Sequence, residues 1–240
     1  SGNWLDASGN GKHLTIISSP TYTNDGNSDY FLLDGTDDKF TNADIDLNSS
    51  DITMEFMVWI NALGNYSNNV FAHVGGVGAV SNGVTTGFML RELNGALSLR
   101  DMANDFSSAT TALSPNKWHH LVCTVTGKIA NLYVDGVNVL SNATLGGTYS
   151  PSATDRLIIG NYNNSSEGWI AGKLAQVRIY RGAMSAAQVN TNYNAIKTLY
   201  QNPDILTDLI PSNYSSGTTW NDSSTKSNNA TLNNFGSTVA

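Results

Sequence analysis

The chain has 240 residues, of which 40% are hydrophobic and only 13% are charged, and its net charge is −7 at neutral pH. This acidic balance argues against nucleic acid and anionic membranes as partners, because both require a basic patch. We find no apolar stretch of the roughly 18 residues that a membrane-spanning helix needs, so membrane insertion is excluded as well. The single cysteine, Cys123, lies in an apolar run and is predicted to be a buried, inert thiol.

A motif near the start of the chain returns near its end. The first copy begins at Trp4 and reads WLDASGNGKHLTI, and the second begins at Trp220 and reads WNDSSTKSNNATL. Trp, Asp, Ser and Thr recur in register 216 positions apart, which is about the length of a whole domain. We predict one domain over 1–201, followed at 202–240 by a linker and the first strand of a repeated copy. The alternative is a strand that returns to complete the first domain.

Between the two copies, short segments of alternating polarity are separated by Gly, Asn and Asp turns, which is typical of β-strands. The predicted strand 52–60 places one apolar row on a single face, namely Ile52, Met54, Phe56, Val58 and Ile60. Asn94-Gly95 and Asp135-Gly136 are predicted to be two-residue hairpin turns, because these residue types tolerate positive φ. Further strands are expected over 87–93, 96–100, 118–125, 129–134, 137–140, 156–159 and 170–180.

One helix is predicted over 186–200, a stretch without Gly or Pro that follows Ser185 as N-cap. Its apolar face consists of Val189, Tyr193, Ile196 and Tyr200. Residues 204–210 are read as a further strand. One helix among many strands predicts an all-β sandwich with a helical appendage.

Several of these segments resemble the signatures of laminin-G-like, concanavalin A-like jelly-roll domains. The segment 117–136, KWHHLVCTVTGKIANLYVDG, is similar to their central strands, and 157–160 with 172–185 resembles their closing strands. The opening motif and the tail at 192–195 are similar to versions found in virion structural proteins of tailed phages. The resemblance implies a concanavalin A-like jelly-roll β-sandwich of two antiparallel sheets with one C-terminal helix. It leaves function open, because lectins, glycanases, adhesion modules and spacers share this fold.

Glycanase activity would require two carboxylates that flank the sugar bond. The best strand offers only Glu55, with Asp51 four residues away, while Glu92 and Glu167 are isolated. We therefore predict no enzyme activity and no catalytic residues. The adjacent His119 and His120 point to opposite faces of a strand and cannot bind one metal together, so a structural role is expected.

Many relatives bind Ca²⁺ through acidic residues in a Gly-x-Ile-Asp-Glu-Val pattern, and here Ala175 and Gln176 occupy both acidic positions. Because Ca²⁺ usually needs carboxylate ligands, we expect no metal and no cofactor. Asp6, Asp37 and Asp38 remain candidate oxygen ligands, but a role as surface turn residues accounts for them more simply.

Carbohydrate binding needs an aromatic platform with amide or hydroxyl groups beside it. Trp59 points away from the predicted core row, and a loop rich in Asn precedes the last strand. The predicted carbohydrate-binding residues are Trp59, Arg91, Asn161, Tyr162 and Trp169. The alternative is that the second sheet or the helix covers Trp59.

The first functional hypothesis is a non-enzymatic structural and adhesion module at a virion surface, on a tail fibre, tail appendage or capsid. Its expected partners are other virion or tandem-domain copies and cell-surface glycans. The second hypothesis is a carbohydrate-binding, lectin-like module of a secreted microbial protein, and the third is a glycan hydrolase. The first two place the chain outside the cell.

Overall fold

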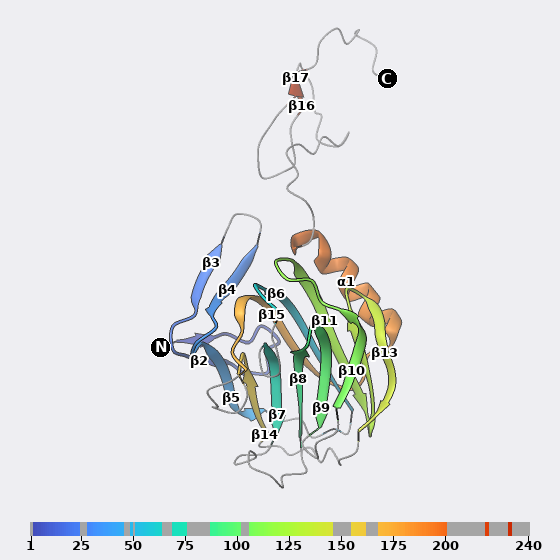
Figure 1. Cartoon of the computed structure of the whole chain (residues 1–240). Coiled ribbons are helices and arrows are strands. Elements are labelled where there is room, and N and C mark those ends of the chain that lie inside the picture. Colours follow the sequence, from blue (N-terminus) through green and yellow to red (C-terminus); the bar gives the residue numbers. More distant parts are fainter. Residues whose placement is uncertain are drawn as a thin grey trace.

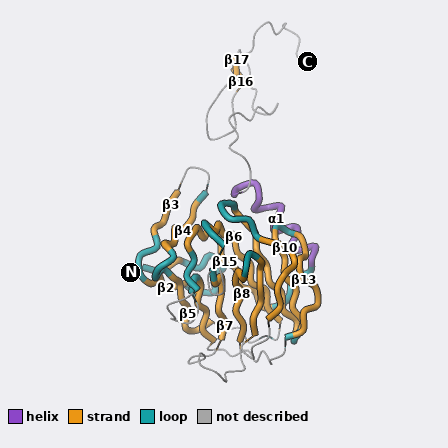
Figure 2. The backbone as a smooth tube through the Cα atoms, in the orientation of Figure 1, coloured by secondary structure: helices purple, strands orange, loops and turns teal. Residues whose placement is uncertain are grey.

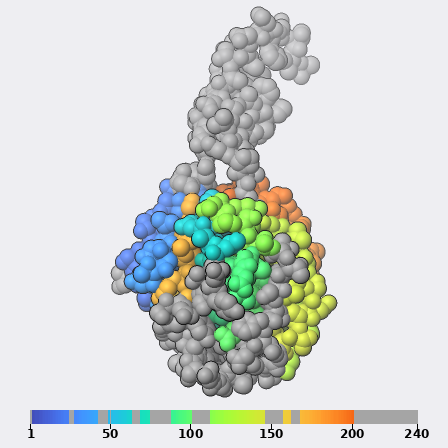
Figure 3. Space-filling model, viewed as in Figure 1, coloured from blue at the N-terminus to red at the C-terminus, as the bar shows by residue number. Residues whose placement is uncertain are grey.

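The computed structural model describes residues 2–24, 28–45, 49, 51–63, 69–75, 87–101, 106–145, 155–161, 168–200, 219–220 and 230–231. Two antiparallel sheets enclose the main hydrophobic core, and a helix lies against the outside (Figure 1). In the space-filling view, the N-terminal residues (blue) and the helix (orange) lie on separate flanks of the sandwich (Figure 3). No helix in the described ranges is long and apolar enough to cross a membrane.

The first sheet has eight strands, and all neighbouring strands in it are antiparallel. Its order is β1 (Asn3–Trp4), β2 (Leu14–Ile17), β5 (Lys39–Ile45), β14 (Asp155–Ile159), β7 (Val70–Gly75), β8 (Gly87–Leu93), β9 (Ala96–Asp101) and β10 (Phe106–Ala112). The late strand β14 inserts between β5 and β7, so segments far apart in the sequence lie side by side.

The second sheet has seven strands, again antiparallel throughout. Its order is β13 (Val137–Thr144), β12 (Ile129–Val134), β11 (Trp118–Thr126), β6 (Asp51–Ile60), β15 (Ala171–Arg181), β4 (Asp29–Asp34) and β3 (Thr21–Asn24). The two sheets confirm the predicted jelly-roll β-sandwich.

The core between the sheets is built from inward-facing apolar rows. The predicted row of β6 is confirmed: its five residues are at most 1% exposed and pack against Phe40, Phe88 and Leu90 of the other sheet. Cys123 belongs to the same core, and burial raises the pKa of its thiol to about 12. The expected buried, inert thiol is therefore confirmed.

The two predicted hairpin turns are also confirmed. Asn94 and Gly95 have φ values of 51° and 86°, and they join β8 to β9 with Leu93 paired to Ala96. Asp135 and Gly136 have φ values of 51° and 77° and join β12 to β13. Positive φ at both central residues is the geometry that matches the twist of the flanking strands.

The helix α1 (Ala186–Tyr200) begins with a reciprocal cap. The backbone N–H of Gln188 donates to Ser185 Oγ at 3.3 Å, and the N–H of Ser185 donates to Gln188 Oε1 at 2.9 Å. This capping box confirms Ser185 as the N-cap, because it satisfies two backbone donors at the helix start.

The predicted apolar face of α1 lies against the outer face of the seven-stranded sheet (Figure 2). Val189 packs on Val122 and Tyr133, and Ile196 packs in a cluster with Met57 and Trp118. The other two members of this face also meet β11: the Tyr193 ring stacks on His120 and the Tyr200 ring lies 5.1 Å from that of Trp118. The sheet is therefore covered on both sides along its centre.

The second motif copy forms two short strands, β16 (Thr219–Trp220) and β17 (Ala230–Thr231), which pair with each other. The predicted boundary near 201 and the predicted strand over 204–210 lie outside the described residues. The division into 1–201 and 202–240 therefore stays a prediction.

Candidate functional site

Strand β15 changes its surroundings halfway along its length. Ala171 to Leu174 pair with β4 on one side and with β6 on the other. After a bulge between Leu174 and Gln176, the strand continues to Arg181 with β6 as its only described neighbour. Bulges bend a strand and end pairing, so the second half of β15 presents a strand edge to its surroundings.

The loop between β1 and β2 lies opposite this edge and is held in shape by the carboxylate of Asp6. Its Oδ1 accepts the N–H of Ser8 at 2.8 Å, and its Oδ2 accepts the N–H of Lys12 at 2.9 Å. The hydrogen bonds from Ser8 hold the pKa of the Asp6 carboxyl below its ordinary value, with help from Lys12. At the end of the loop, the N–H of Asp6 donates to His13 Nδ1 at 3.0 Å.

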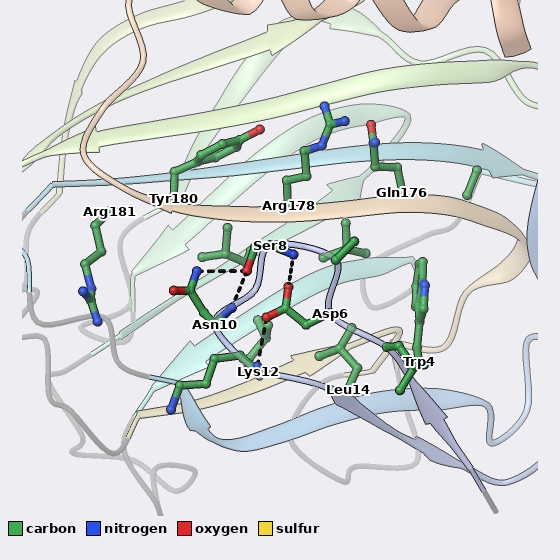
Figure 4. A pocket seen from close by; sticks show the side chains of 16 residues that line it. Trp4, Asp6, Ser8, Asn10, Lys12, Leu14, Gln176, Arg178, Tyr180 and Arg181 are labelled. Carbon is green, nitrogen blue, oxygen red and sulfur yellow. Dashed lines mark hydrogen bonds between the residues drawn. The ribbon is translucent and has the colours of Figure 1, made fainter.

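A groove of about 900 Å³ separates this loop from β15, and we call it the β15 groove (Figure 4). Its apolar surface includes Val177 and Ile179 of β15, together with Leu14 and Leu157. Its polar lining on the hairpin side comes from the loop residues Asp6, Ser8, Asn10 and Lys12. The groove thus combines an apolar surface with hydrogen-bonding side chains, as sites for small ligands do.

The opposite side of β15 carries a different set of residues. Gln176, Arg178 and Tyr180 are also among the residues that line the groove, but in Figure 4 their labelled side chains extend to the side of the strand away from the loop. The Tyr180 hydroxyl donates to Glu55 Oε2 at 2.8 Å, and the Arg178 guanidinium lies 3.7 Å from the same oxygen. These two residues therefore turn toward a buried carboxylate of the neighbouring strand.

Glu55 lies at the centre of a buried polar group that joins four elements. Its Oε1 is 2.8 Å from His120 Nε2, and its Oε2 also accepts from Asn192 Nδ2 of α1 at 3.2 Å. We call Glu55, His120, Tyr180, Asn192 and Arg178 the Glu55 cluster. Burial alone would raise the pKa of the Glu55 carboxyl, but the hydrogen bonds from His120 and Tyr180 hold it below its ordinary value.

His119 has its own partners. Its Nδ1 is 2.9 Å from Asp135 Oδ2, and its Nε2 lies between the backbone N–H and carbonyl of Ser114 at 3.1 and 3.0 Å. Asp135 Oδ1 also accepts the N–H of His120 at 2.9 Å. The two imidazole rings thus contact different carboxylates, Asp135 for His119 and Glu55 for His120, in agreement with a structural role for each.

Trp59 lies on the outer face of the seven-stranded sheet, within an aromatic cluster near α1. The Lys173 ammonium is 4.7 Å from the centre of the Trp59 ring and 4.6 Å from that of Tyr30. The Trp118 ring lies 6.1 Å from that of Trp59 in an edge arrangement. Neighbouring side chains therefore pack against the half-buried Trp59 ring, which the sequence predicts to be a sugar platform.

Three other predicted residues do lie together, around Asn69 and Val70. Arg91 pairs with Val70 across β7 and β8. The N–H of Gly160, next to Asn161, donates to the Val70 carbonyl, and the Trp169 carbonyl accepts the N–H of Asn69. Arg91 is only 7% exposed and Asn161 is fully buried, while Lys39 lies 5.4 Å from the half-buried ring of Trp169.

Tyr162 lies outside the described residues. Arg91 of β8 thus lies near the connecting segments that hold Asn161, after β14, and Trp169, before β15. Trp59 belongs to β6 of the other sheet. Their role in sugar binding stays a prediction.

Two of the three acidic residues named as candidate oxygen ligands, Asp6 and Asp38, accept backbone N–H groups. The carboxylates of Asp34, Asp37 and Asp38 lie within 4.8 Å of one another. Asp38 accepts the N–H groups of Ser19 and Asp34 at 3.1 and 3.0 Å, and burial raises the pKa of its carboxyl. Asp34 accepts the N–H of Thr36 at 2.7 Å. This geometry favours the turn interpretation.

Sequence reasoning missed the β15 groove, although one signal pointed to its loop. Asp6 and Ser8 recur in the second motif copy as Asp222 and Ser224. The two recurring residues are those that fix the loop, whereas Asn10 and Lys12 are replaced by other residues in the second copy. The groove itself was not readable, because its other wall is formed by β15, far along the sequence.

Known proteins share the family and the fold of this chain. The model of the concanavalin A-like lectin/glucanases superfamily matches residues 34–190, more than half of the chain. No curated protein sequence matches it. Among solved structures, domain 4 of AbnA, a GH43 extracellular arabinanase from Geobacillus stearothermophilus in complex with arabinotriose, has a TM-score of 0.60 and 17% identity, and the alignment covers 78% of this chain and 90% of that one.

Two toxin domains are similar in the same way. The binding domain of Paraclostridial mosquitocidal protein 1 has a TM-score of 0.55 and 19% identity, with coverage of 85% of this chain and 51% of that one. The botulinum neurotoxin serotype D binding domain has a TM-score of 0.58 and 16% identity, with coverage of 80% and 48%. At these identities the likeness concerns the fold alone.

Proposed function

Because this chain belongs to the concanavalin A-like lectin/glucanases superfamily, we propose that it is a non-enzymatic carbohydrate-binding module that serves in adhesion. The observation that carries this proposal is the β15 groove. Its volume of about 900 Å³ falls in the range of small-molecule sites, about 300–1,000 Å³. The polar loop residues supply hydrogen bonds to sugar hydroxyls, and Val177 and Ile179 contact the apolar faces of sugar rings. A fold neighbour, the arabinanase domain 4, was solved with arabinotriose, which supports a sugar ligand.

The carboxylates of the described residues support a binding role over hydrolysis. A glycosidase needs two carboxyl groups on either side of the sugar bond, about 5–9.5 Å apart. Asp6 is the single carboxylate among the described lining residues of the groove, and both of its oxygens accept backbone N–H groups. Glu55 is fully buried beneath α1 and is hydrogen-bonded within its own cluster. Neither residue is placed to protonate a glycosidic oxygen.

For the biological setting we propose a virion surface, with this module strung in series on a tail fibre, a tail appendage or a capsid. The repeated motif supports this, because it supplies a second copy of the first hairpin in the same chain. The second candidate is a carbohydrate-binding module of a secreted microbial protein. A catalytic domain next to this one in the parent polypeptide would favour the second candidate, and a tandem array of sandwiches would favour the first.

A glycan array tests the proposed function, with a panel of neutral and acidic oligosaccharides. The wild-type chain is expected to bind a defined subset. Asn10→Ala and Arg181→Ala each remove an exposed polar side chain from the groove and should weaken this binding. Lys128→Ala is the matched control, because Lys128 is an exposed cation in the turn between β11 and β12 and does not line the groove.

Trp59→Ala distinguishes between two candidate binding sites, the β15 groove and the site predicted from the sequence. Because Lys173 and Trp118 surround the Trp59 ring, the folded variant is expected to keep the glycan profile of the wild type. Loss of binding in Trp59→Ala, together with full binding in Asn10→Ala and Arg181→Ala, would move the site to the outer face of the seven-stranded sheet. An array without any specific signal would reject the function itself.

A further inference from the structure

The described strands of the two motif copies pair in the same register. In the first hairpin, Asn3 pairs with Thr15 and Trp4 pairs with Leu14. In the second hairpin, Thr219 pairs with Thr231 and Trp220 pairs with Ala230. Each partner in the second hairpin lies 216 positions after its counterpart in the first. The repeat therefore extends from residue identity to strand register.

The first hairpin closes one side of the sandwich with its tryptophan. The Trp4 ring lies 5.0 Å from that of Phe31 and 5.2 Å from that of Phe40. Trp4, Leu14 and Ile16 pack against the main core. The same hairpin extends the eight-stranded sheet, because Thr15 and Ile16 of β2 pair with Thr41 and Phe40 of β5.

The second hairpin keeps the docking tryptophan and has Ala230 in place of Leu14. Among the described residues it has no second acceptor strand. Trp220 and Leu232 stand at the positions of Trp4 and Ile16. Among the described strands, β16 and β17 pair only with each other, and an isolated two-stranded hairpin is marginally stable in water. The one β5 has β2 on one side and β14 on the other, so both of its edges are taken.

We propose that residues 219–231 form a second docking hairpin, whose acceptor is the β5 edge and the Phe31–Phe40 pair in a second copy of this sandwich. The hairpin takes the place there that residues 3–17 take here, with Trp220 in the Trp4 position. A second copy of this chain carries its own first hairpin, so residues 219–231 compete there with residues 3–17 for the β5 edge. The proposal rests on hairpin pairing and is independent of the proposed glycan function.

This exchange changes the β15 groove of the acceptor. Two loop residues recur in the sequence, because Asp222 and Ser224 correspond to Asp6 and Ser8 of the first hairpin. Five lining positions differ in the second copy, and two of them move a charge: Lys226 replaces Asn10 and Asn228 replaces Lys12. The other three are Asn221, Ser223 and Ala230 in place of Leu5, Ala7 and Leu14. An acceptor that takes the second hairpin therefore has a groove with its cation at a different position in the loop.

Disulfide trapping in the full-length chain tests the proposal. Thr15 and Thr41 are direct partners across β2 and β5, and such Cα atoms lie within reach of a disulfide. The proposed exchange puts Thr231 in the place of Thr15, so Thr41→Cys with Thr231→Cys should cross-link. Trp4→Ala is added to weaken the competing first hairpin. The native Cys123 does not interfere, because it is fully buried.

The expected product under mild oxidation is a covalent dimer or longer oligomer on a non-reducing gel. Adding Trp220→Ala should abolish it. The positive control is Thr15→Cys with Thr41→Cys in a chain that keeps Trp4. It should form a disulfide within one molecule. The Trp4→Ala variant could fail to fold, so the cysteines at 41 and 231 are also placed in a chain that keeps Trp4. This chain should give the same dimer more slowly.

Two results would overturn the proposal. Cross-linked monomer in the 41/231 chains would mean that the second hairpin returns to its own sandwich. Absence of any 41–231 cross-link in both backgrounds, with the 15–41 control closed, would mean that the second hairpin does not recognise this acceptor. Loss of glycan binding in any of these chains has no bearing on either outcome.

Discussion

The two sides of strand β15 differ in what their polar residues do. On one side, Tyr180 and Arg178 join the Glu55 cluster, whose carboxylate is fully buried beneath α1. On the other side, the β15 groove is open, and its lining contains mainly hydrogen-bonding loop residues and apolar strand residues. The residue types usually associated with catalysis, Glu, His and Tyr, thus lie on the closed side. Under the proposed function, access to the solvent and not residue type distinguishes the binding side from the supporting side.

The largest expected loss of stability comes from removing the carboxylate of the Glu55 cluster. Glu55→Ala leaves His120, Tyr180 and Asn192 without their shared acceptor inside the protein. Each buried donor that is left without an acceptor costs about 1–3 kcal/mol of unfolding free energy. Urea unfolding measures this loss. Arg178→Ala is the matched control: its side chain is 45% exposed and 3.7 Å from Glu55, so it should cost less than about 1 kcal/mol. Equal losses in the two variants would contradict a buried structural role.

A second effect tests how closely α1 docks on the sheet. At Gly136, a Cβ atom would lie 2.7 Å from Cδ1 of Tyr193, and φ is 77°. Gly136→Ala therefore combines backbone strain of about 1–2 kcal/mol with overpacking of about 1–3 kcal/mol. Gly127→Ala is the control, because Gly127 has a φ of 56° in a similar turn but no atom within 4 Å of an added Cβ. Thermal unfolding should show a larger loss at 136, and equal losses would mean that α1 does not press on this turn.

The pH dependence of stability gives a smaller effect. The folded state holds the pKa of Glu55 below its ordinary 4.5, so ionised Glu55 stabilises the fold above that pH. This contribution is lost as the pH falls from 4.5 through the lower folded pKa. Unfolding free energies between pH 7 and about 3 should therefore decline more steeply in the wild type than in Glu55→Gln. The raised pKa of Asp38 has the opposite sign, but it is common to both proteins and cancels in the difference. Parallel curves would contradict the assignment.

The inward row of β6 was predictable from the sequence, whereas its outward row was not. Alternation assigned Ile52, Met54, Phe56, Val58 and Ile60 to the core without knowledge of any partner strand. The outward residues Thr53, Glu55 and Met57 are equally buried, because residues 182–200 return to cover them. Single-strand periodicity carries no information on such a distant cover, so Glu55 was read as a lone strand residue.

The candidate site shows the same limit. Hairpin turns and the helix cap depend on local residue types, and Asn94-Gly95 and Ser185 were found from them. The β15 groove depends on a bulge in β15 and on a loop more than 150 residues earlier in the sequence. Trp59 was correctly placed on the outward face, but its contact with Lys173 arises between two strands and has no local signal.

The central claim is that the open side of β15 binds sugar while the closed side supports the fold. Its most direct test is a titration of the isotope-labelled chain with the oligosaccharide that binds best on the array, followed by backbone amide NMR shifts. We expect the largest shifts at residues 5–13 and 175–181, with Glu55→Gln titrating in the same way. Shifts centred on Trp59 or on Asn161 and Trp169, with the groove amides unchanged, would contradict it.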